Sequence, residues 1–136
     1  MRVVVGAVLR DVDGRVLAAL RHSPPGWELP GGKVKPGESE RAALVRELRE
    51  ELGVTVEVGD RIGPDVPIGQ DLLLRAWTAV VIAGEPTALE HAELRWLAEH
   101  ELDSVAWLPA DRPIVTALTA PPGHPRPDRT ARSTQS

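Results

Sequence analysis

The stretch GGKVKPGESERAALVRELREELGV, residues 31–54, joins a glycine pair and a proline-glycine turn to one short amphipathic helix. Ser39 stands where a helix is capped, apolar residues recur at helical spacing up to Leu52, and Gly53 follows where a left-handed residue ends many helices. The stretch also carries five glutamates, at Glu38, Glu40, Glu47, Glu50 and Glu51. A turn and a sharply bounded helix therefore organise this part of the fold, and the crowded negative charge needs a physical explanation.

The chain has the size and composition of a single globular domain. Its 136 residues are 42% hydrophobic and 26% charged, which suits a protein that buries about two-thirds of its unfolded surface. The last residues, PPGHPRPDRTARSTQS, offer almost nothing apolar to bury. The sequence predicts one domain over residues 1–120 and a disordered tail, rich in Pro, Arg and Ser, over residues 121–136.

Composition excludes several classes of function. The absence of cysteine excludes disulfides, thiolate metal sites and a cysteine nucleophile, so any metal must have oxygen or nitrogen ligands. A net charge of −4 argues against a surface for nucleic acid polymers, whose phosphates are held by excess Lys and Arg. The apolar stretches are too short to span a membrane, and no signal peptide is recognised. We expect a cytoplasmic monomer or homodimer whose partner is a small molecule.

Periodicity and turn residues predict the other elements. We expect a hairpin of two strands (residues 3–9 and 15–20), a loop over 22–35 broken only by the extended WEL, strands over 54–62 and 72–82, a strand over 93–97, a helical turn over 98–102, and a helix over 113–120. Strands and helices thus alternate irregularly along the chain.

The helix of residues 31–54 gathers carboxylates on one side. Glu47, Glu50 and Glu51 are three and four residues apart, so they project together beside an apolar stripe. Like charges at these spacings destabilise a helix by about a few tenths of a kcal/mol per pair. A hard divalent cation such as Mg²⁺ compensates them best. The alternative is a solvated face on which the glutamates pair with Arg41, Arg46 and Arg49.

The spacing of the stretch favours the cation. Gly32, Glu38 and the run RELREELGV over residues 46–54 match the pattern G-x5-E-x7-R-E-U-x-E-E-x-G-U at every position, with U aliphatic. This pattern is the signature of the Nudix hydrolases. VVVGAVLR, WELPGGK, GEP and PAD also occur in the order typical of MutT-like members, so the resemblance covers residues 2–118. It implies an α/β (α+β) Nudix fold, an α/β/α sandwich with a mixed central sheet.

The resemblance also implies a reaction. Nudix enzymes cleave a nucleoside diphosphate linked to another group, by attack of water on phosphorus with Mg²⁺ or Mn²⁺ held by glutamates of the motif. By position, Glu50 and Glu51 match the main metal ligands, Glu47 a ligand and candidate base, Arg46 an arginine that orients a neighbouring glutamate, Glu38 a supporting residue, and Gly32 a carbonyl that reaches the metal.

Three residues other than the fixed positions of the motif match further parts of such a site. Glu90 lies where MutT-like members present an additional carboxylate to the metals, although it also fits an ordinary loop glutamate. Arg21 and Lys33 match basic residues that contact phosphates, and the alternative for each is plain surface charge. The four tryptophans are expected mainly in the core, with one available to stack on a base. The histidines are expected at the surface or in loops, at His22, His91, His100 and His124.

The substrate is predicted from what lies outside the motif. There is no tyrosine, which argues against diadenosine-polyphosphate enzymes, and no SQPWPFPxS element of the NADH type. Asp111 occupies the position of an asparagine that contacts oxidised guanine in MutT-type enzymes. An ionised aspartate accepts but does not donate, so it suits the exocyclic amine of cytosine. Asp111 could instead cap the last helix.

The segment WLPADRP, residues 107–113, resembles the CTP-preferring branch, whose actinobacterial members take dCTP and 5-methyl-dCTP. The sequence therefore predicts a Mg²⁺-dependent pyrophosphohydrolase of (deoxy)cytidine-type triphosphates that sanitises the nucleotide pool. The alternatives are an 8-oxo-dGTP diphosphatase and a Nudix module that senses a nucleotide without cleaving it.

Overall fold

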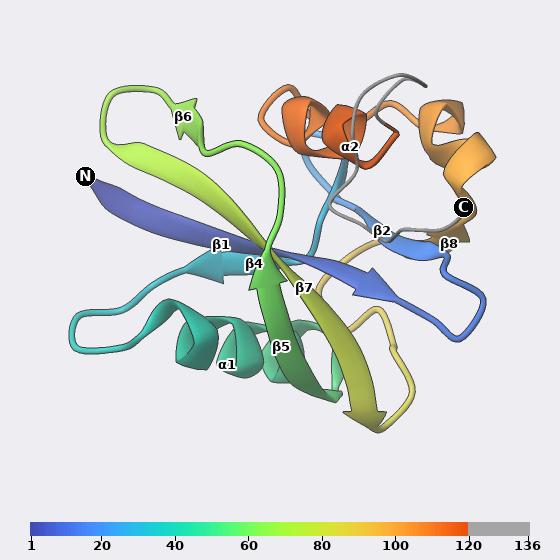
Figure 1. Cartoon of the computed structure of the whole chain (residues 1–136), viewed down its shortest axis with the longest axis horizontal. Helices are drawn as coiled ribbons and strands as arrows, with labels where there is room; N and C mark the ends of the chain where they lie inside the picture. The colour runs from blue at the N-terminus through green and yellow to red at the C-terminus, as the bar shows by residue number, and fades with distance from the viewer. Residues whose placement is uncertain (120–136) are drawn as a thin grey trace, which may run out of the picture.

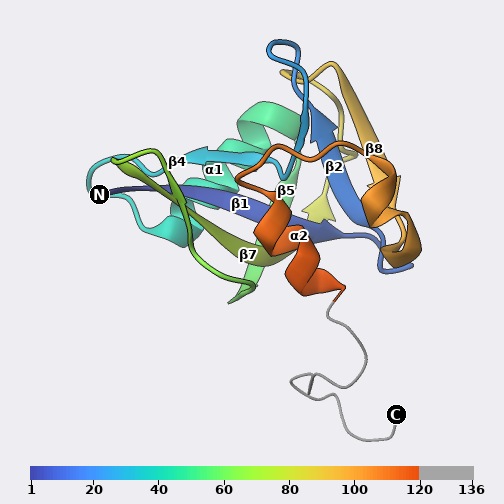
Figure 2. The ribbon, with the colours of Figure 1, turned by 90° about the horizontal axis from the view of Figure 1, so that it is seen from above.

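The computed structural model describes residues 1–119 and places helices on both faces of one twisted sheet (Figures 1 and 2). The strands are β1 (Arg2–Arg10), β2 (Val16–Leu20), β3 (Trp27–Glu28), β4 (Gly31–Lys33), β5 (Thr55–Arg61), β6 (Val66–Ile68), β7 (Leu72–Ala83) and β8 (Glu93–Leu97). The helices are α1 (Glu40–Leu52), the 3₁₀ helix η1 (Glu99–Ser104) and α2 (Arg112–Leu118). The predicted order of long strands and helices is confirmed.

The sheet is mixed. Its main order is β3-β2-β1-β7-β5, while β4 pairs with β1, β6 with β7 and β8 with β2. The central pair β1 and β7 is parallel, and every other pairing between the eight strands of residues 1–119 is antiparallel. With α1 on one face and η1 and α2 on the other, this is the α/β/α sandwich that the sequence predicts (Figure 1).

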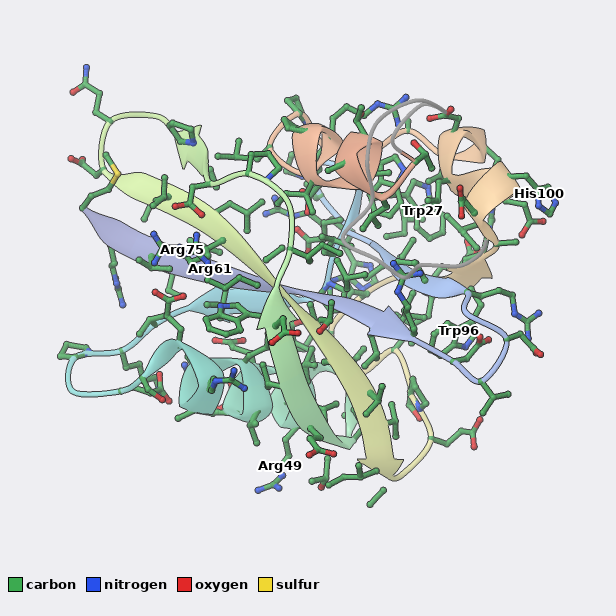
Figure 3. The ribbon with its side chains drawn as sticks, in the orientation of Figure 1. Trp27, Arg49, Arg61, Arg75, Trp96 and His100 are labelled. Atoms are coloured by element: carbon green, nitrogen blue, oxygen red, sulfur yellow. The ribbon has the colours of Figure 1, made fainter. Side chains whose placement is uncertain are left out.

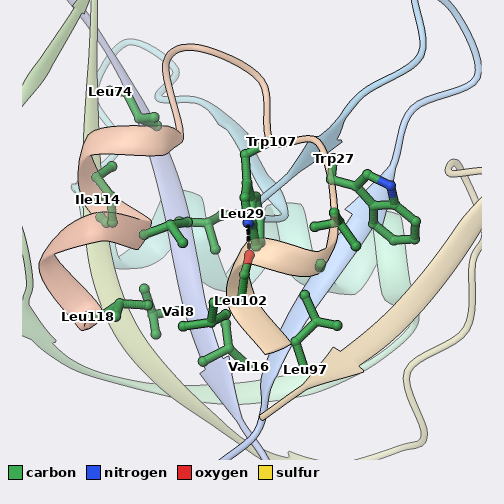
Figure 4. Close-up of a cluster of buried hydrophobic side chains, with 14 residues drawn as sticks. Val8, Val16, Trp27, Leu29, Leu74, Leu97, Leu102, Trp107, Ile114 and Leu118 are labelled. Atoms are coloured by element: carbon green, nitrogen blue, oxygen red, sulfur yellow. Dashed lines mark hydrogen bonds between the residues drawn. The ribbon is translucent and has the colours of Figure 1, made fainter. Parts of the chain in front are cut away.

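Alternation along β1 divides the buried side chains between two cores, because successive strand residues point to opposite faces of a sheet. Val5, Ala7 and Leu9 pack with α1, whereas Val8 packs with η1 and α2. The second core also contains Trp107, whose indole N–H donates to the Leu102 carbonyl at 2.6 Å (Figure 4). The sheet is thereby covered on both faces.

Helix α1 begins and ends where its sequence predicts. The Ser39 hydroxyl accepts from the Ala42 N–H at 3.0 Å, and Gly53 adopts φ 71° at the C-terminal end. In the first turn, Glu40 accepts hydrogen bonds from Arg75 at 2.6 Å and from the Trp77 indole at 3.0 Å. Glu40 therefore fastens α1 to β7 and takes no part in the candidate site.

Charged side chains continue this attachment beyond the helix. Arg61 and Arg75, which lie side by side in Figure 3, share the carboxylate of Asp65 at 2.6 and 2.8 Å. The network connects α1 through β7 to the segment between β5 and β6. It fixes the start of α1 and so the direction of its acidic side.

Some local predictions were wrong. The loop expected over residues 22–35 contains the strand β4, and the expected connection between residues 62 and 72 contains β6. Both strands have three residues, too few for a period to be visible, and β4 also depends on β1, a partner distant in the chain. The last helix starts at Arg112, and the predicted tail lies outside the described residues. No helix within residues 1–119 is long and apolar enough to cross a bilayer.

Candidate active site

Strand β4 and helix α1 bring the two ends of the 31–54 stretch together. The Gly31 N–H donates to Glu51 Oε1 at 3.1 Å. Glu51 is only 8% exposed, and this burial, reinforced by the charges of Glu47, Glu28 and Glu90, raises its pKa to about 8. A carboxyl group in this state gains most from any positive charge that enters the site.

Gly32 lets the neighbouring carboxylate reach the backbone. A Cβ at this position would lie 2.3 Å from Glu47 Cδ and 2.5 Å from Glu47 Oε2, so only glycine leaves the space free. Burial is the main cause that raises the pKa of Glu47, and Arg46 opposes it. A carboxylate whose pKa lies closer to neutrality is a better proton acceptor at neutral pH.

Arg46 donates hydrogen bonds to several residues of the motif. Its Nε and Nη2 donate to the two oxygens of Glu38 at 2.7 and 3.0 Å, and Nη2 also donates to the Lys33 carbonyl at 3.1 Å. Its Nη1 donates to Glu47 at 3.0 Å and to Glu50 at 3.3 Å. These bonds lower the pKa of Glu38 to about 2 and raise that of Arg46. Glu38 thus holds the Arg46 guanidinium in place.

The three glutamates on one side of α1 differ in their surroundings. Glu51 is buried, the Glu47 side chain is 16% exposed, and the Glu50 side chain is 49% exposed. The pair Arg46–Glu50 is the one i,i+4 ion pair within α1. Arg41 forms no such pair and instead stacks over the Trp77 ring at 4.7 Å. A solvated face with many i,i+4 ion pairs, the alternative interpretation, therefore does not explain why the glutamates gather on this side of α1.

Replacing Arg46 with lysine tests whether these hydrogen bonds hold the site together. A lysine ammonium cannot reproduce the forked contacts to Glu38, Glu47 and the Lys33 carbonyl at the same time. We expect Arg46→Lys to lower the free energy of unfolding by about 1–3 kcal/mol and the rate of the reaction that the resemblance implies by about tenfold to a hundredfold. Urea unfolding and steady-state kinetics measure both effects. Unchanged kinetics would show that Arg46 does not hold Glu47 for the reaction.

A polar pocket of about 240 Å³ opens beside the buried carboxylate. Its lining residues come from the end of β2, from β3, from α1 and from the loop before β8: Arg21, His22, Ser23, Glu28, Glu51, Glu90 and His91. The structure thus brings Arg21 and Glu90, two residues predicted from outside the motif, to Glu51. The side chain of Lys33 is exposed and does not line this pocket, so its observed contribution is the carbonyl that binds Arg46.

Asp111 lies at the start of α2 but does not cap it with its side chain. Its Oδ1 instead accepts from the Leu29 N–H at 3.0 Å, and the residue is 5% exposed. Asp111 therefore stands at the N-cap position, as the alternative expected, but its side chain makes no capping hydrogen bond. Burial raises the pKa of Asp111 to about 7, and the nearby charges of Glu28 and Arg21 act on it in opposite directions. Asp111 lies close enough to the pocket to sense its charges.

Two residues of the pocket were missed by sequence reasoning. His91, expected at the surface or in a loop, is buried, and its Nε2 lies 2.9 Å from Glu28 Oε2. Its Nδ1 is the one buried side-chain polar atom without a partner among residues 1–119, which costs about 1–3 kcal/mol. Glu28 belongs to the WELPGGK segment, so its place next to the motif could have indicated a position in the site. No local pattern predicts the burial of His91.

The donor set fits a hard divalent cation. Within the described part of the chain, no three His, Asp or Glu side chains are already arranged to hold a metal ion. Mg²⁺ does not require such a group, because it keeps several waters and takes one or two carboxylates together with substrate phosphates. Glu51 is buried beside Glu47, Glu28 and Glu90, and their mutual repulsion is what such a cation relieves. Glu47 and Glu50 each retain one oxygen that does not bind Arg46.

Known proteins share this sequence and fold. The chain matches the NUDIX domain family over residues 1–130. It is 50% identical over 123 residues to "Putative 8-oxo-dGTP diphosphatase 2" of Mycobacterium tuberculosis, which covers 85% of this chain and 86% of that protein. It is 39% identical over 123 residues to "CTP pyrophosphohydrolase" of Escherichia coli, covering 86% and 90%.

Solved structures agree. The solution structure of the E. coli ORF135 protein superposes with a TM-score of 0.76 at 40% identity and covers 88% of this chain and 89% of that one. The MutT NUDIX hydrolase of Burkholderia pseudomallei superposes with a TM-score of 0.73 at 32% identity, covering 87% and 98%. Together with the complete 32–54 motif and the carboxylates that it gathers around Arg46 and Gly31, these matches show that the chain belongs to the Nudix hydrolase family.

Proposed function

We propose that the protein is a Mg²⁺-dependent pyrophosphohydrolase of (deoxy)cytidine-type triphosphates, which yields a monophosphate and pyrophosphate, with Mn²⁺ as a substitute. The observation that carries the proposal is the buried Glu51, held by the Gly31 N–H among further carboxylates of an intact motif. A small nucleotide is its partner. A cytoplasmic location and a role in sanitising the nucleotide pool belong to the same proposal.

Each residue of the site has a role in this reaction. The cation, when bound, neutralises the polyphosphate and the charge that develops at phosphorus. Glu50, Glu51, Glu90 and the Gly32 carbonyl are the proposed ligands, with Glu47 as a further ligand. Glu47 also accepts the proton of the attacking water, because its pKa is raised and Arg46 holds one of its oxygens. Arg46 in turn is held by Glu38.

The phosphates are assigned to the basic residues near the motif. Arg21 lines the same pocket as Glu51, and its side chain is 45% exposed although its Nε lies 4.0 Å from Glu28 Oε1, so it is proposed to bind a phosphate. Lys33 belongs to β4, has an exposed side chain and is proposed to contact the outer phosphates. Both positive charges would then act on the phosphates of the substrate.

Asp111 is proposed to recognise the base. Oδ1 is held by the Leu29 N–H, and Oδ2 has no hydrogen bond within the described residues although it is not sealed from solvent. The ionised form accepts from the exocyclic amine of cytosine, which dCTP, 5-methyl-dCTP and CTP all carry. The 39% identity to the CTP pyrophosphohydrolase supports this choice.

One observation favours 8-oxo-dGTP as a second candidate. Because the pKa of Asp111 is raised to about 7, the side chain is partly protonated at neutral pH. A protonated Asp111 donates as well as accepts, so it can bind a purine carbonyl as an asparagine would. The 50% identity to the mycobacterial protein named for 8-oxo-dGTP supports the same candidate.

The protonation state of Asp111 gives the test. We expect kcat/KM to be higher for dCTP and 5-methyl-dCTP than for 8-oxo-dGTP, and the ratio of dCTP to 8-oxo-dGTP to rise from pH 6 to pH 8 as Asp111 ionises. The ratio removes effects common to both substrates, such as the titration of Glu51. Asp111→Asn should lower kcat/KM for dCTP by about tenfold or more.

The opposite preference, with 8-oxo-dGTP favoured and the ratio unaffected by pH, would contradict the assignment to cytosine and leave the hydrolysis intact. No release of pyrophosphate from any nucleotide with Mg²⁺ would contradict the enzyme itself and favour a module that binds nucleotides without cleaving them. The intact motif and the buried Glu51 argue against that module.

A further inference from the structure

We propose that Glu28 is an additional cation ligand of this site and that His91 is the residue that positions it, an inference that rests on the proposed function. Neither residue lies in the 32–54 motif. Glu28 ends β3, and His91 lies in the loop before β8. Both line the pocket that also contains Glu51 and Glu90.

The two oxygens of the Glu28 carboxylate are in different situations. Oε2 lies 2.9 Å from the Nε2 of His91. Oε1 makes no hydrogen bond to any residue from 1 to 119, and the Arg21 Nε is 4.0 Å away, beyond hydrogen-bond distance. The Glu28 side chain is 24% exposed. One oxygen is therefore held in place while the other remains available to a ligand in the pocket.

The charges around the pocket favour a cation at that oxygen. The negative charges of Glu28 and Glu90 both act on the Glu51 carboxyl, so three carboxylates surround one space. Arg21 is the lining arginine, and its side chain is nearly half exposed, which weakens its compensation of these charges. A hard divalent cation with oxygen ligands offsets such a cluster, and a carboxylate is its preferred protein donor.

His91 gives an independent indication that the pocket is built for a ligand. Its side chain is 5% exposed and lines the pocket, and its Nδ1 is buried without a partner. A buried polar atom left unpaired in this way calls for a functional explanation, because it lowers stability. Carboxylates that bind metals are themselves held by hydrogen bonds from groups behind them. His91 stands in that position relative to Glu28, because its Nε2 contacts Oε2 and not Oε1.

Equilibrium binding of Mn²⁺ to the full chain without nucleotide, followed by electron paramagnetic resonance of the free ion, tests the proposal. We expect Glu28→Gln and His91→Phe each to weaken Mn²⁺ binding by about tenfold, the effect typical of groups that hold metal ligands. The double variant should bind no more weakly than Glu28→Gln, because His91 acts through Glu28. His91→Gln should retain most of the affinity, because its amide can donate from the place of Nε2.

Glu93→Gln is the matched control, since Glu93 is an exposed glutamate of β8 that pairs with Arg95. The affinity of this variant for Mn²⁺ should equal that of the wild type. Glu28→Gln decides the matter even if His91→Phe does not fold, because it preserves the shape of the side chain. Wild-type affinity in Glu28→Gln, or lower thermal stability in both variants with unchanged affinity, would overturn the proposal and show a purely structural pair. Failure of the wild-type chain to bind Mn²⁺ would instead contradict the proposed function.

Discussion

Glu51→Gln is expected to abolish most hydrolysis and, at the same time, to stabilise the metal-free protein at alkaline pH. The glutamine keeps an oxygen that can accept from the Gly31 N–H, so the loop and helix remain joined. It removes the buried charge that the cation would neutralise. Loss of one preorganised electrostatic contact lowers kcat on the order of 10²–10³-fold.

The stability effect follows from the raised pKa of Glu51. Between its ordinary value of 4.5 and about 8, the folded protein holds a proton at Glu51 that the unfolded chain has lost. The unfolded state thus binds fewer protons, and stability falls as pH rises through this window. At 1.36 kcal/mol per pKa unit, the wild type loses about 3–5 kcal/mol that Glu51→Gln retains. The difference between the two proteins should be smallest near pH 5 and largest near pH 9.

Urea unfolding in EDTA at pH 5, 7 and 9 measures this difference, and Mg²⁺ should raise the melting temperature of the wild type but not that of Glu51→Gln. Glu57→Gln, a change at an exposed glutamate of β5, is the control and should follow the wild type in every respect. A Glu51→Gln variant that is less stable than the wild type at pH 9 would show that the carboxylate serves the fold and not a cation.

Gly31→Ala is expected to prevent folding. A Cβ on Gly31 would lie 1.9 Å from the Val5 carbonyl oxygen and 2.9 Å from Gly6 Cα, both backbone atoms of β1. Neither atom can move without separating β4 from the centre of the sheet. We expect a loss of about 3–5 kcal/mol or more, as for severe overpacking against backbone. Circular dichroism and the yield of soluble protein measure this loss of folding. A wild-type melting temperature in Gly31→Ala would contradict the predicted clash with β1.

Gly32→Ala is the matched neighbour and should separate activity from folding. Its Cβ would meet the Glu47 carboxylate, the end of a flexible side chain that can turn away. The fold should survive, whereas a base displaced by about 1 Å lowers turnover by about a hundredfold. Measuring kcat and the melting temperature of both alanine variants separates the effect on activity from the effect on folding. Wild-type turnover in Gly32→Ala would exclude Glu47 from its proposed role as the base.

Local patterns in the sequence were enough for much of this protein. The ends of α1 at Ser39 and Gly53 were predictable because caps depend on neighbouring residues only. The strands β1, β2, β5, β7 and β8 were predictable because each is long enough to show its period or apolar content. The spacing from Gly32 to Val54 identified the family, because the motif contains the helix geometry that places its carboxylates on one side.

Contacts between distant residues decided the rest. His91 and Glu28 are 63 residues apart and Asp111 and Leu29 are 82 apart, so no local pattern reports either hydrogen bond. Burial likewise separates Glu51 from Glu50, although the two are adjacent in the chain and alike in chemistry. The sequence by itself determined which groups carry the chemistry. Only the tertiary structure decided which of them are buried, paired or free, because desolvation and pairing arise when separate elements pack together.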